Sequence, residues 1–350
     1  NSIDPGDLCS YNPIMEKSKA PLVDLHHILA ADQRFGNVNP GNDHVWELTT
    51  SRGEPPALAL QSTLGLRANG LRVFPRFIQN QVVITDPRSF FQSSLVEFSD
   101  SNFISLTCAP FQGLEVTQKT WVPDSQTLVS EILMRNTTET TQQVRLEWVV
   151  LLKSFTTNSP MSPTQISVNT VLCGQSENVY PVFFMTGGPQ SNLSAYPSLG
   201  IDMVLMANTS RQVSWALTSL ESTEASFYSA RKYTSYSLAN EQIKLQMLLK
   251  SERIVFEFEN NDWSSRLKDS QVRTFQLLMP PFQNLGHTSL VHSRNPDERL
   301  ADDVLEGIHT PAGEVWDILD LWVLSRSLLP TQPQIVRELL QNLFDWQDED

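Results

Sequence analysis

Residues 143–150 read QVRLEWVV, and this stretch decides the fold class. Every second residue from Val144 to Val150 is apolar, Arg145 and Glu147 stand between the first three of them, and Gln143 precedes them. Successive side chains of a β-strand point to opposite faces of a sheet, so this alternation predicts a strand that is buried on one side.

Similar short runs recur along the chain and are separated by Pro, Gly, Asn, Asp or Ser. A series of strands without intervening helices indicates a large antiparallel sandwich rather than a parallel sheet, because parallel strands need helical crossovers. We expect this β-supersandwich at residues 57–260, after an irregular lead segment at 1–56. The predicted strands include LRVFPRFI (71–78), QVVITD (81–86), FISLTC (103–108), LEVTQKTWV (114–122), TLVSEILM (127–134), RQVSWAL (211–217), IKLQMLL (243–249) and RIVFEFE (253–259).

The pattern changes to helical from residue 261 to the end of the sequence. A first helix is predicted at 262–280, with Asp262 as its N-cap and prolines at its end. A second helix is predicted after Thr310-Pro311 and contains EVWDILDLWVLSRSLLP (314–330). The third is QIVRELLQNLFDW (334–346), and the short connection predicts an antiparallel hairpin of these two helices.

These features together resemble the six-hairpin glycosidase superfamily, which includes glucoamylase-like, glycogen-debranching and mannosylglycerate-hydrolase-like enzymes. The resemblance rests on a sandwich that ends in an Asn-Asp-Trp step, a Ser-Arg-x-Pro-Asp loop (293–297), a Trp-Asp pair (316–317) and an aromatic-Gln-acidic turn (346–348). It implies a galactose-mutarotase-like supersandwich followed by the first helices of an incomplete (α/α)6 catalytic toroid.

The resemblance also implies a sugar subsite. Asp317 shares one helical stripe with Leu321, Leu324 and Leu328, so its carboxylate lies at the end of a predicted buried face. In such a toroid Asp317 would accept hydrogen bonds from sugar hydroxyls, and Trp316 would offer its ring to the pyranose.

Arg294 would donate a fork of hydrogen bonds to the same sugar or hold Asp297 in place. Two alternatives stay open for these residues. Asp317 can be an ordinary acid favoured by the helix dipole, and Arg294 with Asp297 can be a solvated ion pair on the surface.

The implied function is the N-terminal portion of a glycoside hydrolase acting on α-glucosides or related storage sugars. Inverting glycosidases need two carboxylates about 6.5–9.5 Å apart, and in this superfamily they lie on later hairpins. We therefore expect the remainder of the catalytic domain to lie outside these residues. One alternative is a non-catalytic carbohydrate-binding or structural sandwich with a helical tail. Another is a mutarotase-like epimerase, which would need a histidine-rich strand motif that the sequence lacks.

Composition excludes several other classes. The net charge of −14 disfavours nucleic acid and anionic membrane surfaces as partners. No apolar run reaches the roughly 18 residues that span a bilayer. Three scattered cysteines form neither a disulfide framework nor a zinc motif, which favours a cytoplasmic location. Hydrolysis by paired carboxylates requires no cofactor or metal, so the expected ligand is an oligosaccharide or small glycoside.

Overall fold

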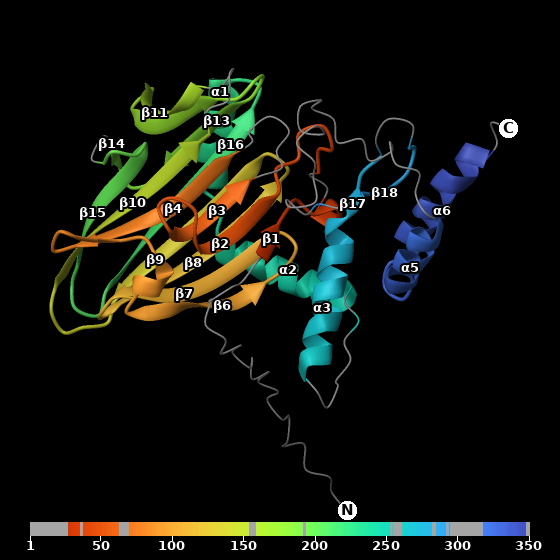
Figure 1. Cartoon of the computed structure of the whole chain (residues 1–350), viewed down its shortest axis with the longest axis horizontal. Helices are drawn as coiled ribbons and strands as arrows, with labels where there is room; N and C mark the ends of the chain where they lie inside the picture. Colours follow the sequence, from red (N-terminus) through yellow and green to blue (C-terminus); the bar gives the residue numbers. More distant parts are fainter. Residues whose placement is uncertain are drawn as a thin grey trace, which may run out of the picture.

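The computed structural model describes residues 27–35, 38–62, 70–153, 159–191, 194–252, 254, 261–281, 285–291, 294 and 318–347. Two eight-stranded antiparallel sheets make up most of this part (Figure 1). The predicted fold class, an antiparallel β-sandwich followed by helices, is confirmed.

The first sheet, sheet A, contains the stretch QVRLEWVV in strand β10. The order of its strands is β1 (His27–Leu29), β2 (Trp46–Arg52), β3 (Ala57–Ser62), β4 (Leu71–Gln79), β10 (Gln142–Leu152), β15 (Ser198–Leu205) and β14 (Gln190–Ser191), with β5 (Val82–Ile84) paired to β4.

The second sheet, sheet B, is also antiparallel and includes four of the other predicted strands. Its order is β11 (Ser159–Ile166), β12 (Asn169–Gln175), β13 (Tyr180–Met185), β16 (Ser210–Leu220), β9 (Thr127–Asn136), β8 (Leu114–Asp124), β7 (Phe103–Phe111) and β6 (Gln92–Ser99).

The main core lies between the two sheets. Trp148 of β10 and Trp215 of β16 meet across it with ring centroids 4.7 Å apart, and Phe183 of β13 packs on Trp215 at 5.2 Å. The alternation in QVRLEWVV has the predicted effect, because Val144, Leu146, Trp148 and Val150 belong to this core. Burial of such side chains contributes about 1.5–3 kcal/mol each.

Two helices cover the outer face of sheet B, and neither was predicted. Helix α1 (Thr223–Tyr233) begins after Ser222, whose hydroxyl accepts a hydrogen bond from the Ala225 amide at 3.2 Å. Helix α2 (Leu238–Glu252) contains IKLQMLL, so the prediction of a strand there is wrong. Its buried leucines, Leu238, Leu245 and Leu249, recur at helical spacing, and Lys, Gln, Met and Leu all favour helices.

The lead segment is less irregular than predicted. Strands β1 and β2 lie within it and form one side of sheet A. The predicted strand RIVFEFE lies outside the described residues except for Ile254.

The helical segment begins with α3 (Asn261–Gln276), which ends four residues before the predicted proline terminus. The short strands β17 (Leu278–Met279) and β18 (Ser289–Leu290) follow as a pair. Helices α5 (Ile318–Leu328) and α6 (Pro333–Gln347) pack together as the predicted hairpin (Figure 1). Their apolar sides enclose a small core with Phe275 and Leu278. Across the described residues, every helix is too short or too polar to cross a lipid bilayer.

Asn136, at the end of β9, holds a turn region of the sandwich together. Its side chain is fully buried, and its Nδ2 donates to the carbonyl oxygens of Thr140, Leu205 and Met206 at 2.7, 3.0 and 3.0 Å. Its Oδ1 accepts from the amide and hydroxyl of Thr138. This one amide therefore joins the ends of strands from both sheets.

Candidate functional site

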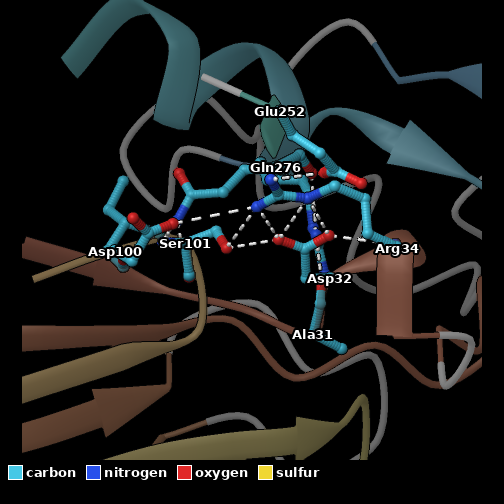
Figure 2. Close-up of polar contacts among 9 residues, drawn as sticks. Ala31, Asp32, Arg34, Asp100, Ser101, Glu252 and Gln276 are labelled. Atoms are coloured by element: carbon cyan, nitrogen blue, oxygen red, sulfur yellow. Dashed lines mark hydrogen bonds and ion pairs between the residues drawn. The ribbon is translucent and has the colours of Figure 1, made fainter. Parts of the chain in front are cut away.

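Two buried arginines join the sandwich to the helical segment. We call this region the junction cluster, and its members are Ala31, Asp32, Arg34, Asp43, Asp100, Ser101, Ser125, Glu252, Gln276 and Arg294. They come from the segment between β1 and β2, from the turns before β7 and after β8, from the ends of α2 and α3, and, in the case of Arg294, from the chain after β18. Figure 2 shows the part of the cluster around Arg34.

Arg294 forms a fork with Asp43. Its Nε donates to Asp43 Oδ2 at 3.0 Å, and its Nη2 donates to Oδ1 and Oδ2 at 2.8 and 2.6 Å. Arg294 is only 3% exposed and Asp43 is fully buried. Planar, bidentate contact is the geometry in which guanidinium and carboxylate interact most strongly.

The remaining nitrogen of Arg294 binds two backbone carbonyls. Nη1 donates to Ala31 O at 2.8 Å and to Gln276 O at 2.7 Å. Gln276 is the last residue of α3, where the helix leaves its carbonyls without partners and its dipole favours a cation. The Gln276 side chain in turn donates to the carbonyl oxygens of Ile28 and Ser101 at 2.9 and 2.8 Å. The end of α3 is thus fixed to sheet A.

Arg34 makes a second buried network beside the first (Figure 2). Its Nε and Nη2 donate to Asp32 at 2.9 and 2.6 Å, and its Nη1 donates to Glu252 of α2 at 3.3 Å. Asp100 lies 3.8 Å from Nη2, and the guanidinium stacks on Phe275 of α3 at 3.9 Å. Although burial alone would lower the pKa of Arg34, the surrounding carboxylates, above all Asp32, raise it.

Serine hydroxyls satisfy the carboxylates further. Ser125 donates to Asp43 Oδ1 at 2.6 Å, and Ser101 donates to Asp32 Oδ2. His44 lies next to Asp43, stacks on Trp46, and is fully buried. Burial lowers the pKa of His44 to about 4 in spite of the adjacent carboxylate, so this ring is neutral near pH 7.

These contacts decide what the cluster can do chemically. Asp32 and Asp43 are closed off from solvent and held by guanidinium groups. A general acid or base must reach the proton that it transfers. The junction cluster is therefore suited to fixing the two parts of the chain together, and not to cleaving a glycosidic bond.

Of the four predicted site residues, only Arg294 is described. The alternative of a solvated surface pair is wrong for Arg294, because the residue is buried and its partner is Asp43. Asp297, Trp316 and Asp317 lie outside the described residues, so their sugar contacts stay predictions. In the stripe that follows Asp317, Leu321 and Leu328 are buried, as predicted, and Leu324 is partly buried.

The other aromatic and histidine residues divide as follows. Trp46, Trp148 and Trp215 are buried in the sandwich and are therefore core residues rather than sugar-binding platforms. Trp263 of α3 is 60% exposed and is not a core residue. His287 lies 3.5 Å from Asp345 of α6. No group of three or more His, Cys, Asp or Glu residues suited to a metal ion occurs in the described ranges.

Sequence reasoning missed Asp32, Arg34 and Asp43. All three lie in the segment that was predicted to be irregular, where no periodicity marks a residue as buried. The signal that was present is local: Asp32 and Arg34 are spaced two apart, and Asp43 follows an Asn-Pro-Gly-Asn turn sequence.

Comparison with known proteins gave structural similarities only. No protein-family model matches the chain, and neither does any curated protein sequence. A protein from the human microbiome assigned as a kojibiose phosphorylase aligns at TM-score 0.45 and 9% identity over 73% of this chain. A bacterial glucoamylase complexed with acarbose aligns at TM-score 0.40 and 9% identity, also over 73%. This chain spans 40% and 39% of their respective lengths.

A galactose mutarotase related enzyme from Lactobacillus acidophilus aligns over 57% of this chain and 99% of its own, at TM-score 0.32 and 6% identity. The fold class rests on the sheets described above, because all three TM-scores are below 0.5.

Proposed function

We propose that this chain is the N-terminal portion of a glycoside hydrolase that acts on α-glucosides or related storage sugars. In this proposal the sandwich supports the helical segment, and the ends of the helices contribute to a sugar subsite. The general acid and base lie on helices beyond these residues.

The observation that carries the proposal is the attachment of α3 to the sandwich. Arg294 binds the last carbonyl of α3 and the carboxylate of Asp43 at the same time, and both contacts are buried. A flexible tail would gain nothing from such contacts, whereas a catalytic domain needs its helices held at a fixed position, since displacements of about 1 Å can lower rates substantially.

The same geometry defines the role that we propose for Arg294. Each of its three nitrogens already donates to acceptors within the protein, so it is a positioning residue for the chain that follows it. Sugar contact is then proposed for Asp297, Trp316 and Asp317, with Asp317 binding hydroxyl groups and Trp316 stacking on the pyranose ring.

Titration of the chain with maltotriose, followed by tryptophan fluorescence, tests this proposal. Saturable binding is expected, and Asp317→Asn should weaken it about tenfold, because hydrogen bonds to a charged group contribute about 1.5–3 kcal/mol. Asp269→Asn, which changes an exposed acid of α3, is the matched control. Equal affinities for the wild type and Asp317→Asn, or no saturable binding, would count against the proposal.

A second candidate is a non-catalytic carbohydrate-binding protein. The observation that favours it is a charged group on the central strands of sheet A, where Arg76 and Arg145 lie 3.0 and 2.8 Å from the carboxylate of Glu147. In that case maltotriose affinity would not change in Asp317→Asn, and substitutions on sheet A would remove binding.

A further inference from the structure

Helices α5 and α6 leave part of their apolar surface uncovered. Five large apolar side chains of this hairpin are between 41% and 64% exposed, and they are Trp322, Val323, Leu329, Leu340 and Phe344. Single exposed apolar residues are normal on protein surfaces, but a group of them on two neighbouring helices indicates a surface that binds a partner.

This end of the molecule is open to a partner (Figure 1). The hairpin lies on the side of the molecule away from the sandwich, with α3 and the short strands β17 and β18 between them. In the described part, α5 packs on α3 and α6 packs on β18. The exposed apolar residues lie on the remaining sides of the hairpin, where a second molecule can reach them.

The apolar stripe of α6 is wider than the core that covers it. Val336 and Leu339 are buried in the small core that the hairpin shares with Phe275, whereas Leu340 and Phe344 are 41% and 64% exposed. Leu340 and Phe344 lie about 40° and 80° around the helix from Val336, on one side of the buried stripe. Such an extension of the stripe forms a seam on which another helix can pack.

Two charged residues flank this seam. Arg337 precedes it and Asp345 follows it along the helix, and they lie on the same flank, about 100° and 180° from Val336. Arg337 is exposed and, within the described ranges, makes no hydrogen bond or ion pair. The side chain of Asp345 is 56% exposed and lies 3.5 Å from His287. We call this region the α6 face, and its members are Arg337, Leu340, Gln341, Phe344 and Asp345.

The α6 face is complementary to itself in an antiparallel arrangement. A two-fold axis beside Gln341 places residues equally far before and after Gln341 opposite each other. Arg337 of each copy then lies opposite Asp345 of the partner subunit, and Leu340 and Phe344 pack between the two ion pairs. Opposite charges that flank an apolar seam select the partner and its orientation in paired helices. A parallel arrangement would bring like charges together, which disfavours it.

We propose that the α6 face is a dimer interface, and that its occupant is the α6 face of a second copy of this chain. One helix from each subunit makes an interface at the small end of the range for specific complexes, so the dissociation constant is expected to be about 10–100 µM. The interface uses exposed residues of α6 and does not depend on the proposed glycosidase function.

Sedimentation equilibrium of the full chain, at concentrations from about 5 to about 200 µM, tests the proposal. The average mass is expected to rise with concentration from that of one chain towards that of two. A mass that stays at one chain, or that passes beyond two, would overturn the proposal. Since maltotriose binding and Asp317→Asn address the sugar subsite, the two proposals can fail separately.

Phe344→Lys should weaken dimerisation at least about tenfold, because it places a charge within the apolar seam. The side chain is 64% exposed in the single chain, so the variant should fold, and circular dichroism checks this. Tyr228→Lys is the matched control, because Tyr228 is an aromatic residue of α1 that is 63% exposed. Equal dimerisation in Phe344→Lys and Tyr228→Lys would contradict the proposal.

Exchange of the two flanking charges separates a specific antiparallel pair from general apolar association. Arg337→Asp should weaken the dimer about tenfold, because two carboxylates then face each other at each end of the seam. Combining Arg337→Asp with Asp345→Arg restores opposite charges across the axis and should restore the wild-type dissociation constant. A dimer that ignores Arg337→Asp, or one that the double variant does not restore, would rule out the antiparallel arrangement.

Discussion

Arg294 and Asp43 are separated by 251 positions in the sequence and meet in a buried, bidentate ion pair. The pair connects the segment after α3 to the segment before β2. It is therefore a contact between the helical part and the sandwich, and its loss should affect both.

Arg294→Met is expected to destabilise the chain by about 3–5 kcal/mol, because it leaves the carboxylate of Asp43 buried without its cation. Urea unfolding followed by circular dichroism measures this change. Arg231→Met, at an exposed position of α1, should change the free energy of unfolding little. The double variant Arg294→Met with Asp43→Asn should recover part of the loss. A loss in Arg294→Met no larger than that in Arg231→Met would show that the pair contributes little.

His44 predicts a dependence of stability on pH. Its pKa is about 4 in the folded chain and 6.5 in the unfolded chain, so between these values only the unfolded chain binds the proton. Stability should thus decrease as the pH falls from about 6.5 to about 4, by about 3 kcal/mol from this residue, and should be unaffected by it above 6.5. Urea unfolding at a series of pH values gives the slope.

His44→Leu should flatten that slope, whatever its effect on absolute stability. Gln341→Leu, at an exposed and non-titrating position of α6, is the control and should keep the wild-type slope in this pH window. The explanation fails if His44→Leu and the wild type lose stability in parallel.

Cys108 should be inert toward thiol reagents in the folded protein. It is buried on β7, and burial raises the pKa of its thiol to about 12, which leaves almost no thiolate at pH 8. Cys173 is half-buried, with its pKa raised by burial to about 11, and should react slowly. Iodoacetamide labelling with peptide mass spectrometry, with and without urea, measures both. Labelling of Cys108 at equal rates in the two conditions would contradict its burial.

Asn342 should decide how firmly α6 is attached. Its Oδ1 accepts from the His287 amide at 3.1 Å, and its Nδ2 donates to the carbonyl oxygens of His287 and Thr288 at 3.3 and 2.9 Å. Asn342→Ala leaves these backbone groups without partners and should cost about 1–3 kcal/mol. Hydrogen exchange should then be faster in α6, while the sandwich keeps its protection.

Gln341→Ala is the matched control, because Gln341 is adjacent and exposed. If hydrogen exchange in α6 is the same in both variants, the Asn342 contacts do not fix the helix.

The sandwich could be predicted because its signal is local. A strand with one buried face alternates within a few residues, as QVRLEWVV does, and β10 lies where this pattern placed it. The run IKLQMLL also alternates, with Lys244 and Gln246 between apolar neighbours, but over so few residues its apolar pattern fits a strand or a helix equally well. Leu245 and Leu249 pack against sheet B, and this packing favours the helix over the strand. The sequence of the run alone does not predict that contact.

The junction cluster could not be predicted for a different reason. Its partners come from distant parts of the chain, and the residues around Asp32 and Asp43 show no periodicity. The motif around Arg294 indicated an arginine with a specific partner, but the partner is Asp43 and not a neighbour in the loop. Pairing between segments is a property of the folded topology.

The buried amide of Asn136 limits which covalent modifications the folded chain can carry. Asn136-Thr137-Thr138 matches the acceptor sequence for N-linked glycosylation. A glycan on Nδ2 would displace hydrogen bonds to three carbonyl oxygens and would need space where the side chain has no solvent exposure. If a secretory expression host glycosylates this asparagine before folding, its side chain cannot make these hydrogen bonds. The ends of the strands from the two sheets then lose the contact that joins them.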